Sequence, residues 1–82
     1  MQVHELKTIN PFFEHLWSGS KDFEVRKNDR DFKVGDRLKL VEYVEAKNYV
    51  PRYILKDVKY ILNGGQYGIA NDYVILGLKD VR

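Results

Sequence analysis

Cysteine is absent from this 82-residue sequence, which excludes disulfide bonds, thiolate metal sites and cysteine nucleophiles. No stretch approaches the roughly 18 apolar residues that a membrane-spanning helix needs. The N-terminal segment MQVHELKTIN also lacks the apolar core of a signal peptide. We therefore expect a soluble protein without a membrane partner. The absence of cysteine also fits a reducing, cytoplasmic location.

Charge of either sign is not in large excess. The chain has 14 Lys and Arg against 12 Asp and Glu, a formal net charge of +2. Such a small excess does not by itself imply nucleic-acid binding, so a basic surface would require the charges to be sorted onto different faces. Histidine is also scarce, with only His4 and His15, and we expect no metal site and no cofactor.

Aromatic residues are well represented, with six tyrosines, four phenylalanines and one tryptophan. They supply enough bulk for the core of one small domain. No internal repeat, low-complexity tract or linker divides the chain. We therefore expect a single domain that spans residues 1–82.

A short strand is predicted over residues 2–8, followed by a helix of about two turns. Asn10 and Pro11 favour a helix start, because Asn is a preferred N-cap and Pro suits the first helical position. Gly19 is expected to end the helix in a left-handed conformation. The apolar face of this helix has the spacing i, i+3 and i+4 and consists of Phe13, Leu16 and Trp17.

From Asp22 onward the pattern is typical of strands. Phe23 and Val25 alternate with Glu24 and Arg26, as in a half-buried strand. A polar loop at 28–31 and a Val-Gly-Asp turn at 34–36 follow, and Pro51 should lie at a strand start or edge. The later strands are expected at 37–44, 53–62 and 73–78, with a hairpin turn at 63–65 and its returning arm at 66–69.

These elements define an α+β protein, in which one short helix after the first strand is followed by five or so further strands. Such an order predicts a small mixed β-barrel. The segment 73–78 is apolar at nearly every position, which predicts a strand that is covered on both faces.

Four short motifs follow one another along the chain. They are HELK at 4–7, FF at 12–13, GSKDFEVRKNDR at 19–30 and VGDRL at 34–38. The set resembles ASCH-type domains of the PUA-like superfamily, in particular a phage- and bacteria-associated branch, and the resemblance covers nearly the whole chain. It implies a PUA-like pseudobarrel with a cleft near the helix and the loop after the second strand.

The same resemblance implies binding of RNA or another nucleic acid or nucleotide. Some ASCH members are instead small amidohydrolases that act on acylated cytosine nucleosides, using a Lys with a nearby Thr and Glu. Lys21 matches the family lysine. Glu24 stands where those hydrolases place Thr, and no residue here matches their catalytic Glu, so hydrolysis is the second hypothesis.

The residues around the end of the helix could bind an anion. Lys21 could offer a point charge to a phosphate or an amine to a carbonyl, or it could be a solvated lysine. Glu24 and Arg26 share one strand face, where they could form an ion pair that orients the guanidinium, or simply an exposed face. The adjoining loop adds residues suited to phosphate or base contacts, namely Lys27, Asn28 and Arg30.

Three further residues are candidates from other segments. His4 and Lys7 lie on the first strand, beside the implied cleft, although His4 could equally be structural. Glu42 is in phase with buried positions of its strand, so it should point inward and need a partner, for which Arg26 or Lys7 is suitable. If the protein is an enzyme, its catalytic residues would be Lys21, Glu24 and Glu42, with Glu42 as a general base.

The tyrosines could include a platform on which bases stack, although most are expected in the barrel surface or core. Three hypotheses follow in order of preference. The first is a nucleic-acid or nucleotide-binding module, the second a hydrolase of modified nucleosides, and the third a protein-interaction domain that uses an exposed barrel edge.

Overall fold

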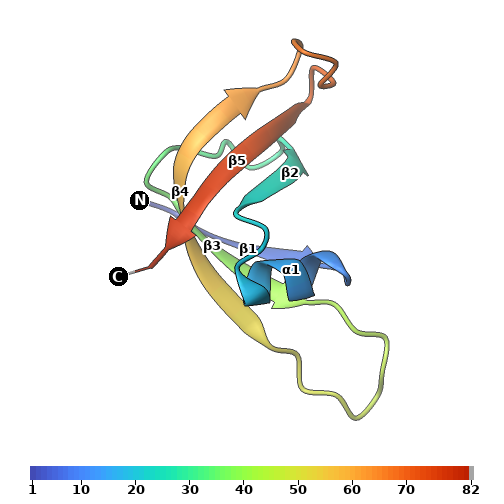
Figure 1. Cartoon of the computed structure of the whole chain (residues 1–82). Helices are drawn as coiled ribbons and strands as arrows, with labels where there is room; N and C mark the ends of the chain where they lie inside the picture. Colours follow the sequence, from blue (N-terminus) through green and yellow to red (C-terminus); the bar gives the residue numbers. More distant parts are fainter. Residues whose placement is uncertain (82) are drawn as a thin grey trace.

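The computed structural model describes residues 1–81 (Figure 1). It consists of one curled sheet, formed by the segments with alternating apolar residues, and one short helix. The sheet forms a half-barrel, and α1 lies between the ends of β1 and β2. The elements are β1 (Val3–Thr8), α1 (Phe12–Ser18), β2 (Phe23–Lys27), β3 (Arg37–Glu42), β4 (Tyr53–Asn63) and β5 (Tyr73–Asp80).

The strand order across the sheet is β1-β3-β4-β5-β2, so β1 and β2 are its two edges. Only the β1–β3 pair is parallel among the described strands. The curl brings the two edges together, where arginine side chains of the β2 region donate to backbone carbonyls of β1. Arg26 Nη2 donates to Lys7 O over 3.1 Å, and Arg30 Nη1 donates to Glu5 O over 3.0 Å. Side chains, and not a strand ladder, therefore connect the edges.

The core lies on the concave face of the sheet. Alternate residues of each strand point inward, and α1 adds two buried side chains from one face of the helix. Each buried aliphatic side chain is worth about 1.5–3 kcal/mol of transfer free energy. The buried apolar residues are Leu6, Phe13, Leu16, Phe32, Leu38, Leu40, Val58, Val74, Leu76 and Leu78.

The helix begins one residue later than the Asn-Pro pair predicts. Pro11 occupies the cap position without a side-chain cap bond, and Asn10 Oδ1 accepts instead from the backbone N–H of Glu14 over 3.2 Å. Gly19 ends the helix with φ of 84°, which confirms the predicted left-handed residue. Trp17 was expected in the buried face, but it is 48% exposed.

β2 has the opposite orientation to the one that its apolar residues suggest. Phe23 and Val25 are 43% and 50% exposed, whereas Glu24 is only 3% exposed. The expectation that the apolar face packs inward is therefore wrong. The reason is that Glu24 has two cationic partners on the inner side, so its carboxylate is buried as part of an ion cluster.

The later strands differ from expectation mainly at the β4–β5 connection. The segment 66–69 is not a returning arm but part of a loop over 64–72, in which Gly65 and Gly68 have positive φ. β5 itself is the returning strand, so four strands follow α1. The prediction that β5 is covered on both faces is wrong, because only the face carrying Val74, Leu76 and Leu78 is fully buried. β3 ends at Glu42, two residues before the expected boundary.

Candidate functional site

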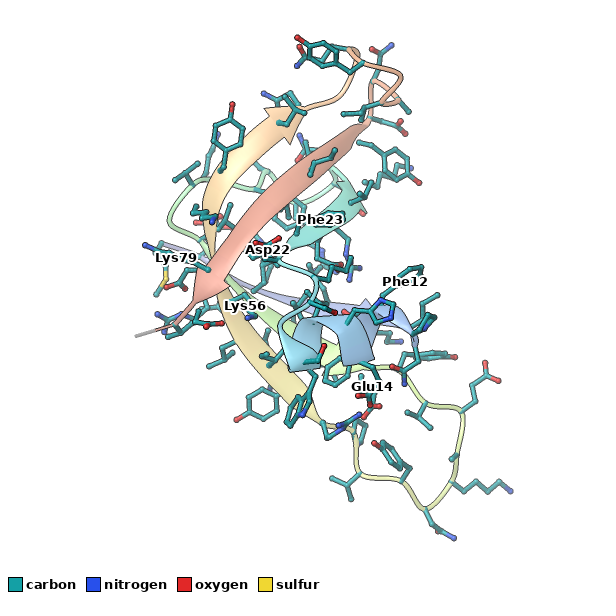
Figure 2. All side chains as sticks on the ribbon, viewed as in Figure 1. Phe12, Glu14, Asp22, Phe23, Lys56 and Lys79 are labelled. Carbon is teal, nitrogen blue, oxygen red and sulfur yellow. The ribbon has the colours of Figure 1, made fainter. Side chains whose placement is uncertain are left out.

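A pocket of about 500 Å³ is lined by residues of β1, α1, β2 and the links that join them. Its size falls within the range of about 300–1,000 Å³ that is typical of small-molecule sites. Phe12 on α1 and Phe23 on β2 lie on the side of the molecule where these two elements meet (Figure 2). The lining consists of the polar residues Lys7, Thr8, Lys21, Glu24 and Arg26 and the apolar residues Ile9, Phe12, Phe23 and Val25.

A buried carboxylate, that of Glu24, is part of the pocket lining. Lys21 Nζ contacts Glu24 Oε1, and Arg26 Nε donates to Glu24 Oε2 over 2.8 Å. Glu24 and Arg26 meet because they are two residues apart on one face of β2. Lys21 reaches the same carboxylate from the turn that follows Gly19. The predicted ion pair is therefore present, and its three charges sum to +1.

Two aromatic rings flank the Lys21 ammonium. Its Nζ lies 5.3 Å from the ring centroid of Phe12 and 5.2 Å from that of Phe23. Cations within about 6 Å of a ring centroid are attracted by the ring. The Lys21 side chain is mostly buried, so it is not the solvated junction lysine that was the alternative. Its ammonium is held at one position in the pocket by Glu24 and the two rings.

Arg26 both lines the pocket and connects the sheet edges. Besides its bond to Glu24, its Nη2 donates to Lys7 O and to Thr8 Oγ1 over 3.1 and 3.0 Å. These contacts fix the plane of the guanidinium. They also hold the end of β1, including Lys7, against the pocket.

A smaller hollow of about 140 Å³ lies on the other side of Arg26 and is lined in part by Lys27 and Arg30. Arg30 is anchored to β1 through Glu5 O. Asn28 lines neither hollow; its backbone N–H donates to Asp72 O over 2.7 Å. The structure therefore brings Lys27 and Arg30, but not Asn28, next to the main pocket.

His4 belongs to a different cluster. Its Nε2 is 2.9 Å from Asp36 Oδ2, and its ring packs edge-on against Phe32. Asp36 also accepts the backbone N–H groups of Gln2 and Lys33, each over 3.0 Å. The Gln2 hydrogen bond, followed by that from His4, lowers the pKa of Asp36 to about 2. His4 is buried and absent from the pocket lining, which fits the structural alternative.

Glu42 points inward as predicted, but its expected partners, Arg26 and Lys7, are wrong. Arg52 forms the ion pair, with Nε 3.1 Å from Oε1 and Nη2 3.0 Å from Oε2. The Tyr49 hydroxyl donates to Oε1 over 2.6 Å, and Asn10 Nδ2 donates to Oε2 over 3.1 Å.

The hydrogen bonds from Arg52, followed by that from Tyr49, lower the pKa of Glu42 to about 2. Glu42 does not line the pocket, so it is not positioned there as a base beside Lys21.

None of the four apolar residues in the pocket lining was identified as a site residue from the sequence. Apolar side chains carry no chemical signature of a site. Phe23 and Val25 line the pocket because they face outward from β2, and Ile9 and Phe12 line it because α1 begins at Phe12. Thr8 could have been found, since it continues the inward alternation of His4 and Leu6.

Residues 1–81 contain no group of three or more His, Asp or Glu side chains that could hold a metal ion. In the same part of the chain, no helix is long and apolar enough to cross a membrane.

The fold and pocket define a class of small α+β half-barrel proteins with a charged site between the sheet edges. A family model matches residues 3–78, and the chain belongs to this family, which is described as a domain of unknown function (DUF3850). No curated protein matches the chain.

Proposed function

We propose that this protein binds a nucleic acid or a nucleotide through the pocket between β1, α1 and β2. The observation that carries the proposal is the Glu24 carboxylate, which lies between two cations in a pocket with aromatic walls. A base has a flat apolar face and a polar edge. The pocket offers surfaces that complement both.

The polar edge of a base would meet the ion cluster. Carboxylates accept hydrogen bonds from exocyclic amino groups, and arginine and lysine donate to ring nitrogens and carbonyls. A carboxylate has about four acceptor positions, and Lys21 and Arg26 occupy one on each oxygen of Glu24. Acceptor capacity therefore remains for a ligand. The rings of Phe12 and Phe23 supply surfaces for stacking.

The phosphate would meet cations at the margins of the pocket. Lys7 lines the opening from β1, while Lys27 and Arg30 line the adjoining hollow beyond Arg26. These side chains surround the ion cluster without being part of it. Phosphate contacts of this kind fix the position of a ligand, and the base contacts provide selectivity.

We also propose that the half-barrel is a PUA-like pseudobarrel of the ASCH type. The support is the order of elements, with one helix after the first strand, and a pocket beside that helix. The lack of cysteine further supports a cytoplasmic location.

An NMR titration tests the proposed function. Isotope-labelled protein is titrated with short RNA, short DNA, a nucleoside panel and inorganic phosphate, at two salt concentrations. We expect shifts that cluster on Lys21, Glu24 and Arg26, and binding that weakens as salt rises. Lys21→Ala and Arg26→Ala should each weaken binding by at least about tenfold, because each removes a charge-assisted contact.

The matched control is Lys47→Ala, which removes an exposed lysine from the β3–β4 loop and should leave binding unchanged. Circular dichroism establishes that each variant is folded. If no RNA, DNA or nucleoside shifts the pocket residues, or if Lys47→Ala weakens binding as much as Lys21→Ala, the proposal is wrong.

Hydrolysis of acylated cytosine nucleosides is the second candidate, favoured by one observation. The amine of Lys21 contacts the carboxylate of Glu24 inside the pocket, as a nucleophile and its proton acceptor would. Turnover of an acylated-nucleoside panel, abolished by Lys21→Ala in a folded protein, would support it. Nucleoside binding without turnover would support the binding function and contradict hydrolysis.

A further inference from the structure

The outer face of β2, β5 and β4 carries an apolar surface that continues from the pocket. On β2 and β5 its side chains point away from the core, because Glu24, Val74, Leu76 and Leu78 between them are buried. On β4, Tyr60 and Leu62 share this face because they pair with Gly77 and Ile75 of β5. Two rows cross the three strands in register. This outer face is defined by Phe23, Gly77 and Tyr60 in one row and Val25, Ile75 and Leu62 in the other.

The outer face begins at the rim of the pocket, since Phe23 and Val25 also line that pocket. Tyr60 lies two strands away, at about 10 Å given the usual strand spacing, and is 63% exposed. Gly77 separates the two aromatic residues without a side chain of its own, and a Cβ there would come within 3.3 Å of Tyr60 Cβ. The first row therefore carries two exposed aromatic side chains, Phe23 and Tyr60, on either side of a glycine that has no side chain.

Lysines border this apolar surface at both ends. Lys27 follows Val25 on the outward side of β2, and Lys79 follows Gly77 on the outward side of β5. Lys79 lies near the C-terminal end of β5 (Figure 2). Asp57, which pairs with Lys79 across β4 and β5, forms an ion pair with Arg37, whose Nε is 2.9 Å from Asp57 Oδ1. The border is thus cationic on both sides.

We infer that the ligand is a single-stranded nucleic acid, with one base in the pocket and its neighbours stacked along the outer face. This inference rests on the proposed function. Exposed aromatic side chains between cations are how proteins bind single strands, because unpaired bases stack while lysines contact the phosphates. A second copy of this chain would bring Lys27 and Lys79 into an apolar interface without phosphates to neutralise them.

The test compares ligand lengths. Labelled random-sequence RNA and DNA oligonucleotides of about eight nucleotides are titrated by fluorescence anisotropy. The corresponding mononucleotides are titrated by NMR under the same buffer. We expect the oligonucleotides to bind at least about tenfold tighter than any mononucleotide, because each stacked base adds affinity.

Variants of Tyr60 locate the extra affinity. Tyr60→Ala and Tyr60→Leu should each weaken oligonucleotide binding about tenfold, and Tyr60→Phe should retain it, because the ring is what stacks. Mononucleotide binding should stay unchanged in all three. Tyr53→Ala is the matched control, since Tyr53 lies on the same strand, away from the two rows that define the outer face, and is 53% exposed.

The outcomes separate this inference from the proposed function. If mononucleotides and oligonucleotides bind equally well, the inference is overturned while the pocket proposal stands. If neither binds, both fail. Sedimentation velocity that reveals a dimer disrupted by Tyr60→Ala, with no preference for longer strands, would identify the outer face as a contact between copies and also overturn the inference.

Discussion

Glu24 and Glu42 are two buried glutamates with different surroundings. Each points inward from a strand, is 3% exposed and pairs with an arginine, which lies two residues away in sequence for Glu24 and ten for Glu42. Glu24 has one cationic partner on each oxygen, Lys21 and Arg26, and borders the pocket. Glu42 accepts from the side chains of Arg52, Tyr49 and Asn10 and borders no described pocket.

The difference shows that burial alone does not identify a site residue. The five hydrogen bonds to Glu42 include a backbone N–H, and together they hold the β3–β4 loop and the helix start against the sheet. Its acceptor capacity is used by the protein itself. Glu24 has one side-chain partner on each oxygen and lines an open pocket. We therefore assign Glu42 to stability and Glu24 to the proposed ligand site, and the predictions below test that division.

A fall in pH should produce the largest change in stability. The pKa values of Glu42 and Asp36 are lowered from 4.5 and 3.8 to about 2. Carboxylates with lowered pKa values stabilise the fold above their unfolded pKa, and this contribution is lost as the pH falls through the folded value. We expect the melting temperature to fall by more than about 10 °C between about pH 5 and pH 2.

Differential scanning calorimetry across this pH range measures the effect. Above about pH 5 both carboxylates are already ionised in either state, so they should contribute no further change in stability. A melting temperature that is constant from pH 5 to pH 2 would contradict the assignment of these two groups as structural anchors.

Removing the charge of Glu42 should have the next largest effect. Glu42→Gln keeps the shape of the side chain but places an amide against Arg52, so we expect the melting temperature at pH 7 to fall by about 10 °C. The drop in melting temperature between about pH 5 and pH 2 should be smaller in this variant, because Asp36 is then the only one of the two carboxylates that remains. Ligand binding at temperatures where the variant is folded should not change, since Glu42 lies outside the pocket.

Thermal unfolding and the anisotropy titration together check this prediction. Lys33→Gln serves as the control, because its ion pair with Asp31 is exposed and such pairs contribute little. Loss of ligand affinity in folded Glu42→Gln protein would mean that the two glutamates act as one site.

Local chemistry made part of this site predictable from sequence. Glu24 and Arg26 lie two apart on one strand, which predicts a shared face, and Gly19 marks the helix end from which Lys21 reaches them. Glu42 was expected inside because it continues the alternation of Leu38 and Leu40. These inferences need only the period of a strand and the preference of glycine for a left-handed cap.

The remaining features depend on contacts between distant segments. An alternating strand is expected to bury its apolar side, but β2 buries Glu24 because cations on the inner side stabilise it. Arg52 meets Glu42 because Val41 pairs with Tyr53 in the antiparallel register of β3 and β4, which brings residues 42 and 52 together. Strand pairing across a ten-residue loop cannot be read from composition or period.

The smallest stability effect, and the most selective one, is expected for Glu24→Gln. Lys21 and Arg26 lose their charged acceptor but border an open pocket, so water can solvate them and the melting temperature should fall by only about 5 °C. Ligand binding should weaken at least about tenfold, because the amide presents a donor where a base amino group needs an acceptor. Glu24→Gln and Glu42→Gln should therefore give opposite rankings in the two assays.

This reversed ranking is more informative than either variant alone. The two substitutions are chemically identical, and both glutamates are equally buried. A general effect of removing a buried charge would therefore lower the melting temperature and the ligand affinity of both variants in parallel. A Glu24→Gln protein that binds ligand normally but melts as early as Glu42→Gln would show that Glu24 is a second structural anchor. The pocket would then have to recognise its ligand through Lys7, Lys21 and the aromatic walls without the carboxylate.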